Sequence, residues 1–242
     1  MKVLVIPDIH LKPWMFQRAA EIMRRKEADR AVCLMDIADD WGQESNVGLY
    51  IETFDAAIAF AEEFSDSLWC YGNHEMPYLY NLYGPGFSEL AEIDVRERLR
   101  RLENILGGEN RISYIHRIDN VLFMHGGLSE RFVRRYITDK NEEIDYDDAD
   151  RIIEEINNMR IADLWHEDTP IWLRPQDDGA DMYKPEDFLQ VVGHTPMEEI
   201  TREKNIISCD VFSTYRNGIY IGTCEFPIID TESWQWEKVQ GR

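Results

Sequence analysis

KVLVIPDIH (residues 2–10) places Asp8 and His10 directly after an apolar run that is typical of a buried strand. In an extended segment, side chains two residues apart point the same way, so both can contact one ion. Similar apolar runs at 31–35, 68–71, 121–124 and 189–192 are each followed, directly or after one glycine, by acidic, amide or imidazole side chains. The sequence therefore predicts an α/β sheet that gathers functional groups at one edge, where its strands end.

Helical spacing of apolar residues at 12–26 and 49–64 separates the first three strands, which predicts βαβ units and a largely parallel sheet. Further helices are expected at 88–102 and 147–159, and the loosely patterned residues 76–87 read as a loop. The remaining expected strands lie at 112–117, 120–124, 206–209, 219–224, 226–229 and 234–239. Two sheets packed face to face with helices outside would use all of these elements. We expect a single domain over 1–242, with lid or insert segments at 76–110 and 138–183.

Bulk composition excludes several classes of function. The 242 residues carry a net charge of −21, which repels long nucleic acids and anionic membranes. No apolar run approaches the roughly 20 residues of a membrane span, and the first residues lack the features of a signal peptide. The four cysteines form no C-x-x-C pair and are expected to be reduced core thiols. These observations predict a cytoplasmic protein.

Four further short motifs carry residues that bind divalent cations. They are Asp36 with Asp39, Gly72-Asn73-His74-Glu75, His125-Gly126-Gly127 and Gly193-His194-Thr195. The carboxylate of Asp36 has two oxygens and can bridge two cations. Taken alone, Asp36 and Asp39 fit a turn and helix cap equally well, and either histidine alone fits a structural role. The five motifs together, each after a strand, favour a two-metal site.

The five motifs in this order resemble the calcineurin-like metallophosphoesterases. Within them the match is to the phosphoprotein phosphatase branch, which includes bacterial and phage-type phosphatases and diadenosine tetraphosphatase-like enzymes. The resemblance runs from Lys2 to about Cys224. It implies a four-layer α/β/β/α sandwich of two mixed sheets with helices outside.

The resemblance also implies a site. One metal would take Asp8, His10 and Asp36, and the other would take Asp36, Asn73, His125 and His194. A hydroxide held between the metals would attack phosphorus. His74, oriented by Asp39, would donate a proton to the leaving oxygen. Arg174, in the segment W-x-R-P, would bind the substrate phosphate together with Asn73. Mixed oxygen and nitrogen ligands suit Mn²⁺, which we expect, as well as Fe and Zn²⁺.

Three positions bear on the substrate. Pro196 stands where related nucleases carry a second metal-binding histidine, which favours the phosphatase branch. Met35 replaces a glycine that is usual before the bridging aspartate. Asp40, followed by Trp41, replaces an arginine that usually holds phosphate. A carboxylate there would repel a dianionic monoester more strongly than a diester.

The sequence thus predicts a metal-dependent phosphoester hydrolase acting on a phosphomonoester or small nucleotide, with a nucleotide or a phosphoprotein as partner. A phosphodiesterase for cyclic or dinucleoside substrates is the alternative, and a non-catalytic metal-binding protein of the same fold is a third hypothesis. Tyr78, Tyr80 and Tyr83 follow the third motif closely. They would either pack a lid onto the body or contact an aromatic substrate.

Overall fold

The first of two mixed β-sheets is built around the N-terminal strand. The computed structural model describes residues 1–108 and 110–242, with the side chains of residues 177 and 178 left undescribed. The six-stranded sheet has the order β11-β10-β1-β2-β3-β4, in which β1 to β4 are parallel and β10 and β11 are antiparallel. Its strands are β1 (Lys2–Ile6), β2 (Arg30–Cys33), β3 (Leu68–Cys70), β4 (Ile112–Ser113), β10 (Glu225–Asp230) and β11 (Trp236–Gln240).

The second sheet has five strands in the order β5-β6-β7-β9-β8. The strands β6, β7 and β9 are parallel, whereas β5 and β8 pair antiparallel at the two edges. Its strands are β5 (Ile115–Ile118), β6 (Val121–Met124), β7 (Leu189–Val192), β8 (Thr201–Glu203) and β9 (Ile206–Ser208). The inner strands are buried on both faces, so every residue of β6 and of β7 is buried, including the polar Gln190.

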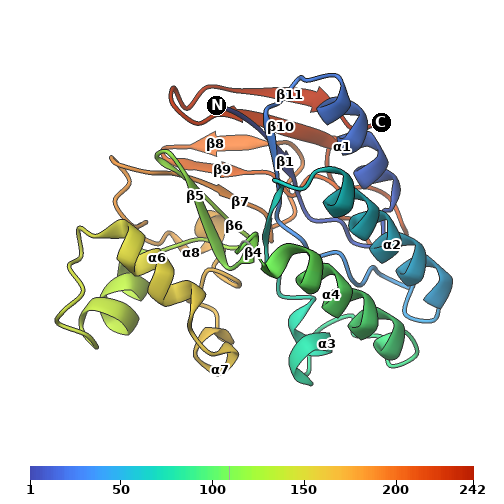
Figure 1. The fold of residues 1–242 in the computed structure, drawn as a ribbon, viewed down its shortest axis with the longest axis horizontal. Coiled ribbons are helices and arrows are strands. Elements are labelled where there is room, and N and C mark those ends of the chain that lie inside the picture. Colours follow the sequence, from blue (N-terminus) through green and yellow to red (C-terminus); the bar gives the residue numbers. More distant parts are fainter. Residues whose placement is uncertain (109) are drawn as a thin grey trace.

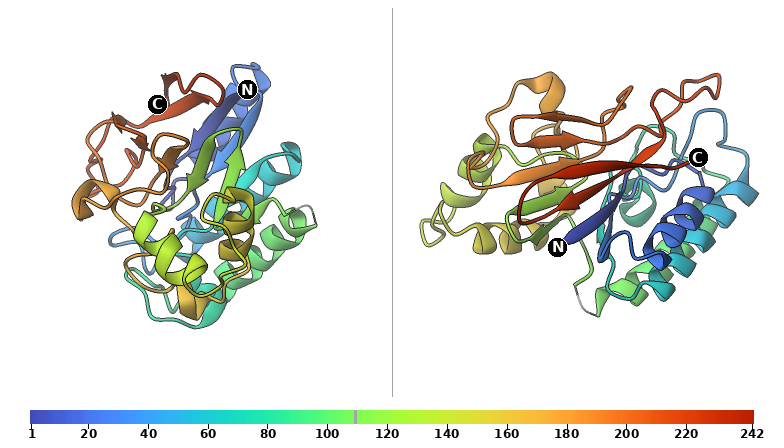
Figure 2. Two further views of the ribbon diagram at one scale, coloured as in Figure 1. Left: turned by 90° about the vertical axis from the view of Figure 1, so that its left-hand side faces the viewer. Right: turned by 90° about the horizontal axis from the view of Figure 1, so that it is seen from above.

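The helices lie outside the two sheets (Figures 1 and 2). Three long helices, α1 (Trp14–Arg24), α2 (Val47–Glu63) and α4 (Glu92–Gly107), lie side by side along the first sheet. On the other side, α6 (Ala149–Asn157) packs against β5. The short helices are α3 (Met76–Tyr80), α5 (Glu130–Phe132), the π-helix Val133–Thr138, α7 (Ile161–Leu164) and α8 (Pro175–Asp178). This arrangement confirms the predicted α/β fold of two mixed sheets with helices outside.

Two apolar clusters form the core. The larger one joins the first sheet to α1, α2 and α4, and in it the ring of Phe16 stacks on Trp69 with 5.7 Å between centroids. The second cluster lies between the second sheet and the segment from α5 to α7. Each helix contributes one apolar face, as for α6, whose Ile152, Ile153 and Ile156 are buried.

Three local expectations were wrong. The strand expected at 112–117 splits at Tyr114, because Ser113 pairs with Cys70 in the first sheet and Ile115 pairs with Met124 in the second. Residues 219–224 form only an isolated bridge between Tyr220 and Thr214. The expected loop at 76–87 begins with α3, which has proline in its first turn, where a missing N–H costs no hydrogen bond. The division into lid or insert segments stays a prediction.

Candidate active site

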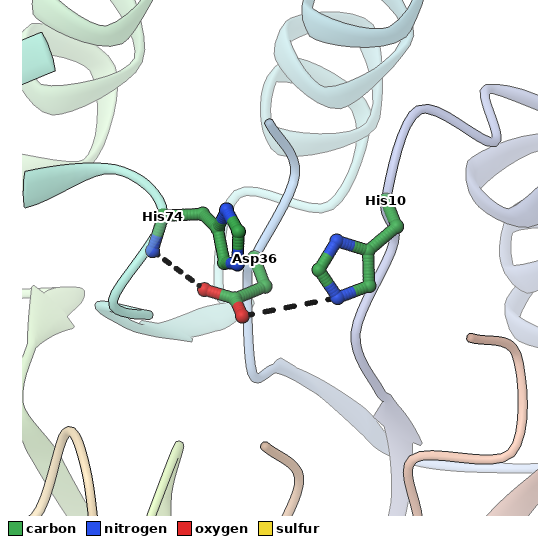
Figure 3. Close-up of side chains that lie close together, drawn as sticks. All are labelled: His10, Asp36 and His74. Atoms are coloured by element: carbon green, nitrogen blue, oxygen red, sulfur yellow. Dashed lines mark hydrogen bonds and ion pairs between the residues drawn. The ribbon is translucent and has the colours of Figure 1, made fainter. Parts of the chain in front are cut away.

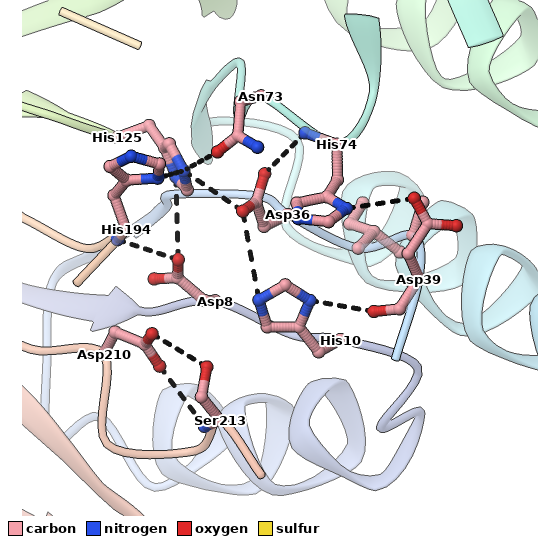
Figure 4. A network of polar contacts seen from close by, with 12 residues as sticks. Asp8, His10, Asp36, Asp39, Asn73, His74, His125, His194, Asp210 and Ser213 are labelled. Atoms are coloured by element: carbon pink, nitrogen blue, oxygen red, sulfur yellow. Dashed lines mark hydrogen bonds and ion pairs between the residues drawn. The ribbon is translucent and has the colours of Figure 1, made fainter. Parts of the chain in front are cut away.

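The motifs converge at one edge of the paired sheets, where the strands end (Figure 4). β1 leads into the loop of Asp8 and His10, and β2 leads to Asp36 and Asp39. β3 leads to Asn73 and His74. From the second sheet, β6 ends at His125 and β7 is followed by His194. The first sheet therefore supplies all the carboxylates and the amide, and the second sheet supplies the two remaining imidazoles.

Asp36 lies at the centre of this cluster (Figure 3). Its Oδ2 atom is 3.1 Å from His125 Nε2 and 3.9 Å from His10 Nε2. Its Oδ1 atom accepts a hydrogen bond of 3.0 Å from the backbone N–H of His74. Two sets of side chains have their ligand atoms within 4.8 Å of one another, and Asp36 belongs to both. The sets are His10, Asp36 and His74, and Asp36, His125 and His194. A shared carboxylate is the arrangement expected of a pair of cations.

His125 shows most clearly that the cluster suits a cation. Its Nδ1 atom lies 3.0 Å from the carbonyl oxygen of Leu34, which can only accept a hydrogen bond. In the neutral ring Nδ1 therefore carries the proton, and Nε2 is an acceptor. Nε2 nevertheless lies 3.0 Å from Asn73 Oδ1 and 3.1 Å from Asp36 Oδ2, so three acceptors meet at this point. Burial alone would lower the pKa of His125, but the carboxylates of Asp36 and Asp8 raise it to about 9. A divalent cation can take the place of that proton among the same acceptors.

Buried polar atoms without partners point to the same conclusion. Asp8 accepts a 2.8 Å hydrogen bond from the backbone N–H of His194 on Oδ1, but its buried Oδ2 atom has no partner. The buried Nε2 atom of His194 has none either. Burial raises the pKa of Asp8 and, together with the charges of His125 and Arg174, lowers the pKa of His194 to about 2. Unsatisfied buried groups are costly, and metal ligation satisfies both of these.

Two glycines let the carboxylates lie against the backbone. A β-carbon on Gly72 would overlap Asp36 Oδ1 and lie 2.7 Å from the backbone nitrogen of Asp36. A β-carbon on Gly193 would overlap Asp8 Oδ2. Side chains larger than hydrogen at these positions would therefore displace the ligands themselves. This explains why glycine precedes Asn73 and His194.

The loop after β2 takes a strained path around the site. Met35, Asp36 and Asp39 have φ angles of 57°, 43° and 64°, in the left-handed region that costs a residue with a side chain about 1–2 kcal/mol. The fully buried carboxylate of Glu75 holds this loop, accepting hydrogen bonds from the backbone N–H groups of Asp36, Ile37 and Ala38 at 3.2, 2.7 and 3.3 Å. Burial, reinforced by the charge of Asp36, raises the pKa of Glu75 to about 7.

His74 is oriented through a chain of buried polar groups. Its Nδ1 atom donates to Asp39 Oδ2 at 3.0 Å, since a carboxylate oxygen accepts. The other oxygen of Asp39 accepts from the hydroxyls of Tyr50 at 2.9 Å and Tyr78 at 2.6 Å. Burial opposes protonation of His74, but Asp36 and Asp39 raise its pKa to about 9. The Nδ1 atom of His74 is thus bound to Asp39, and its Nε2 atom is the one left to interact with a substrate.

Arg174 and Asp40 lie on the cavity in front of the cluster. Arg174 Nη1 donates to the carbonyl oxygen of His194 at 2.6 Å and to Thr195 Oγ1 at 3.3 Å. Asp40 accepts from Lys12 Nζ at 3.0 Å and from Thr214 Oγ1 at 2.7 Å. The expected repulsion of a dianionic substrate by Asp40 is therefore reduced, because a buried ammonium neutralises the carboxylate.

The cavity has a volume of about 250 Å³. Most residues of the cluster line this cavity. Its lining includes His10, Asp36, Asp39, Asp40, Trp41, Glu44, Asn73, His74, Pro85, Gly86, Trp172, Arg174, His194 and Asp210. A space of this size next to convergent polar groups suits one small phosphorylated compound.

Sequence reasoning missed several residues of the site. Glu75 is the last residue of the third motif, next to His74, so its place in the motif could have identified it as part of the site. Tyr50, Lys12 and Asp210 gave no local signal, because only folding brings them to Asp39, Asp40 and the cavity wall. Among the three expected tyrosines, Tyr78 is buried against Asp39 and none is part of the cavity lining in the described residues.

The chain belongs to the family described as calcineurin-like phosphoesterase, whose sequence profile matches residues 1–220. It is accordingly a hydrolase that acts on phosphoric esters, a class that uses divalent metal ions. No curated protein matches this sequence.

Solved structures show the same fold at low sequence identity. A cold-active protein-tyrosine phosphatase from a psychrophilic Shewanella species aligns with a TM-score of 0.55 and 17% identity, over 99% of this chain and 80% of that one. A hypothetical protein from Pyrococcus horikoshii aligns with a TM-score of 0.51 and 12% identity, over 99% and 87% of the two chains.

In the described part of the chain, no helix has both the length and the hydrophobicity of a membrane span.

Proposed function

We propose that this protein hydrolyses a phosphomonoester or a small nucleotide, with two divalent cations and with His74 as the proton donor. The observation that carries the proposal is the position of His74. Its backbone N–H donates to Asp36, the carboxylate shared by both ligand sets, while its ring is held by Asp39. His74 belongs to one of the two sets of possible ligands, and we propose that it donates a proton instead of binding a cation.

The metal ligands proposed are those expected from the sequence. Asp8, His10 and Asp36 would hold one cation, and Asp36, Asn73, His125 and His194 would hold the other. The convergent acceptors around His125 and the unpartnered atoms of Asp8 and His194 fit such ions. Their oxygen and nitrogen donors suit Mn²⁺, Fe or Zn²⁺, of which we propose Mn²⁺. Bound there, the cations would supply a water molecule of lowered pKa and neutralise the phosphate.

The side chains divide the remaining work. Arg174 lies at the cavity wall and its planar guanidinium is suited to phosphate oxygens. As the bond from phosphorus to the leaving oxygen breaks, His74 Nε2 donates its proton to that oxygen, and Asp39 stabilises the imidazole through Nδ1. General acid catalysis of this kind contributes about 10²- to 10⁴-fold to the rate.

Two variants of the manganese-loaded protein test the proposal. Asp36→Asn should abolish both uptake of the metal, measured by elemental analysis, and hydrolysis of phosphomonoesters. His74→Asn should keep the metal and slow hydrolysis, least for 4-nitrophenyl phosphate, whose leaving group needs no proton. Equal losses for nitrophenyl and alkyl esters would exclude the role of His74 as proton donor.

The phosphodiesterase alternative is separable by substrate. Pairing of Asp40 with Lys12 removes much of the charge that would have favoured a diester, and this supports the monoester. Parallel assays with 4-nitrophenyl phosphate, its bis-ester and a dinucleoside polyphosphate would decide between them. Faster turnover of the bis-ester would contradict the monoester proposal.

The four thiols are buried and unpaired, in keeping with the cytoplasmic location, which stays a prediction.

A further inference from the structure

The cavity has a second wall that the proposed chemistry does not use. We call it the outer wall and define it as Asp40, Trp41, Glu44, Pro85 and Gly86, all of which line the cavity. It is formed by the loop that follows β2 and by the loop between α3 and α4. None of its residues belongs to either set of possible metal ligands. The outer wall therefore faces the part of the substrate that extends beyond the phosphate.

Trp41 is the unusual member of the outer wall. Half of its surface is exposed (50%), and unlike the other exposed large hydrophobic residues of the described chain it lines the cavity. The guanidinium carbon of Arg216 lies over the indole, 4.8 Å from its centroid. Trp41 lines the cavity and Arg216 does not.

The backbone at Trp41 is fixed as well. Its N–H donates to the carboxylate of Asp40 at 2.8 Å. That carboxylate is held in turn by Lys12 and by Thr214, which belongs to the same loop as Arg216. The indole therefore lies between two anchored elements and is oriented before any ligand arrives, which lowers the entropic cost of binding.

The outer wall adjoins the position of the leaving group. A β-carbon placed on Gly86 would lie 3.6 Å from Cε1 of His74 and 3.0 Å from Cβ of Asp39. His74 is thus hydrogen-bonded to Asp36 through its backbone, and its ring lies on the side of Gly86. A leaving group that takes the proton of His74 extends toward the wall that contains Trp41.

Charge limits what that leaving group can be. Asp40 and Glu44 bring carboxylates to the outer wall, and because Lys12 neutralises Asp40, Glu44 carries most of the negative charge of this wall. A second phosphate on the leaving group would meet the carboxylate of Glu44. A neutral, flat group would instead pack against the indole, and any hydroxyl or amine on it could donate to a carboxylate.

On the basis of the proposed function, we infer that Trp41 determines substrate specificity by stacking on a planar aromatic leaving group of the phosphoester. Two sources share this chemistry. A phenolic ester such as phosphotyrosine carries the ring on the leaving oxygen, and a nucleoside monophosphate carries a base beyond a ribose. An aliphatic phosphate would leave Trp41 without a contact.

Binding of two non-hydrolysable probes tests the inference without relying on turnover. We expect the manganese-loaded wild-type protein to bind phenylphosphonate about 10-fold or more tightly than methylphosphonate in calorimetric titrations. Trp41→Ala should remove this preference, and Trp41→Phe should keep most of it. Equal binding of the two probes by the wild type, or a preference that survives in Trp41→Ala, would overturn the inference.

Tyr83→Ala is the matched control. Tyr83 is a 93% exposed aromatic residue that does not line the cavity, so its removal should leave the preference unchanged. Loss of the preference in this variant too would show that the effect is not specific to Trp41, and would count against stacking.

Steady-state kinetics then identifies the source of the ring. If Trp41→Ala raises KM more for phosphotyrosine than for adenosine 5′-monophosphate, the leaving group is phenolic, and the reverse result indicates a nucleoside. A KM unchanged for both, with β-glycerophosphate as the aliphatic reference, counts against stacking. A binding preference without any hydrolysis would refute the proposed function alone. Hydrolysis without a preference would refute only the role of Trp41.

Discussion

The two walls of the cavity are built by different means. The ligand wall, which consists of Asp8, His10, Asp36, Asn73, His125 and His194, is nearly all buried and rests on glycine contacts and backbone hydrogen bonds. The outer wall contains a half-exposed indole and depends on side chains from distant loops, through Lys12, Thr214 and Arg216.

This difference separates chemistry from specificity. A ligand held by the backbone cannot move without unfolding a strand end, so the ligand wall tolerates little change. The side chains of the outer wall hold no proposed cation. We therefore expect substitutions in the ligand wall to affect every substrate, and substitutions in the outer wall to affect stability or particular substrates.

The largest effect is expected for Gly72→Ala. Its β-carbon would overlap Asp36 Oδ1, so the shared ligand must move. Metal affinity and kcat/KM should each fall by about 100-fold for all substrates. Gly107→Ala is the matched control, because a β-carbon there meets nothing within 4 Å. Metal content after dialysis and initial rates provide the measurement, and an active Gly72→Ala protein would contradict the account of the ligand wall.

The next largest effect concerns the buried ion pair behind the outer wall. Lys12→Met leaves Asp40 without its cation, and we expect the free energy of unfolding in urea to drop by about 3–5 kcal/mol. The double variant Lys12→Met with Asp40→Asn should recover most of this loss. Lys2→Met, which breaks the exposed pair of Lys2 with Glu237, should leave the free energy of unfolding nearly unchanged. Equal costs for the two single variants would show that the Lys12 pair is not effectively buried.

Asp39→Asn should act on the boundary between the walls. It removes the negative charge beside His74 and replaces one of the two acceptor oxygens of Asp39 by an NH2 donor, so His74 and the two tyrosine hydroxyls compete for one oxygen. Every proposed metal ligand stays in place. We expect kcat for alkyl phosphates to fall about 10- to 100-fold, a much smaller change for 4-nitrophenyl phosphate, and unaltered metal content. A uniform loss across leaving groups would assign Asp39 a structural role instead.

The smallest effect is expected at Met35, where strain and packing oppose each other. Met35→Gly relieves the left-handed backbone, worth about 1–2 kcal/mol. It also removes a fully buried side chain, which costs about 2–5 kcal/mol. The difference of the two ranges predicts a net loss of about 0–4 kcal/mol in thermal or urea unfolding. A Met35→Gly protein more stable than the wild type would show that strain outweighs packing.

Much of the fold and of the candidate site could be predicted from local signals. The apolar runs before Asp8, Asp36, His125 and His194 lie at or within a few residues of strands β1, β2, β6 and β7. Glycine at 72 was readable as part of a motif, and the structure supplies its reason, the carboxylate that lies against it. These signals are local because a strand end and the residue after it are adjacent in the chain.

Other features had no local signal. Residues 112–117 read as one strand, yet the chain passes from one sheet to the other at Tyr114, a choice made by the partners on each side. The tyrosines near His74 were predicted as possible aromatic contacts of the substrate, whereas the indoles that line the cavity are those of Trp41 and Trp172. Arg216, whose guanidinium lies over Trp41, is remote from it in sequence.

The amino-acid order by itself determined which residues could bind cations and where the strands that carry them end, since periodicity and motif spacing are properties of neighbouring residues. Tertiary structure alone decided that Asp40 is neutralised by Lys12, that Asp39 is held by Tyr50 and Tyr78, and which aromatic ring meets the cavity. Each of these depends on distances between side chains from separate loops, and such distances exist only after the two sheets have packed.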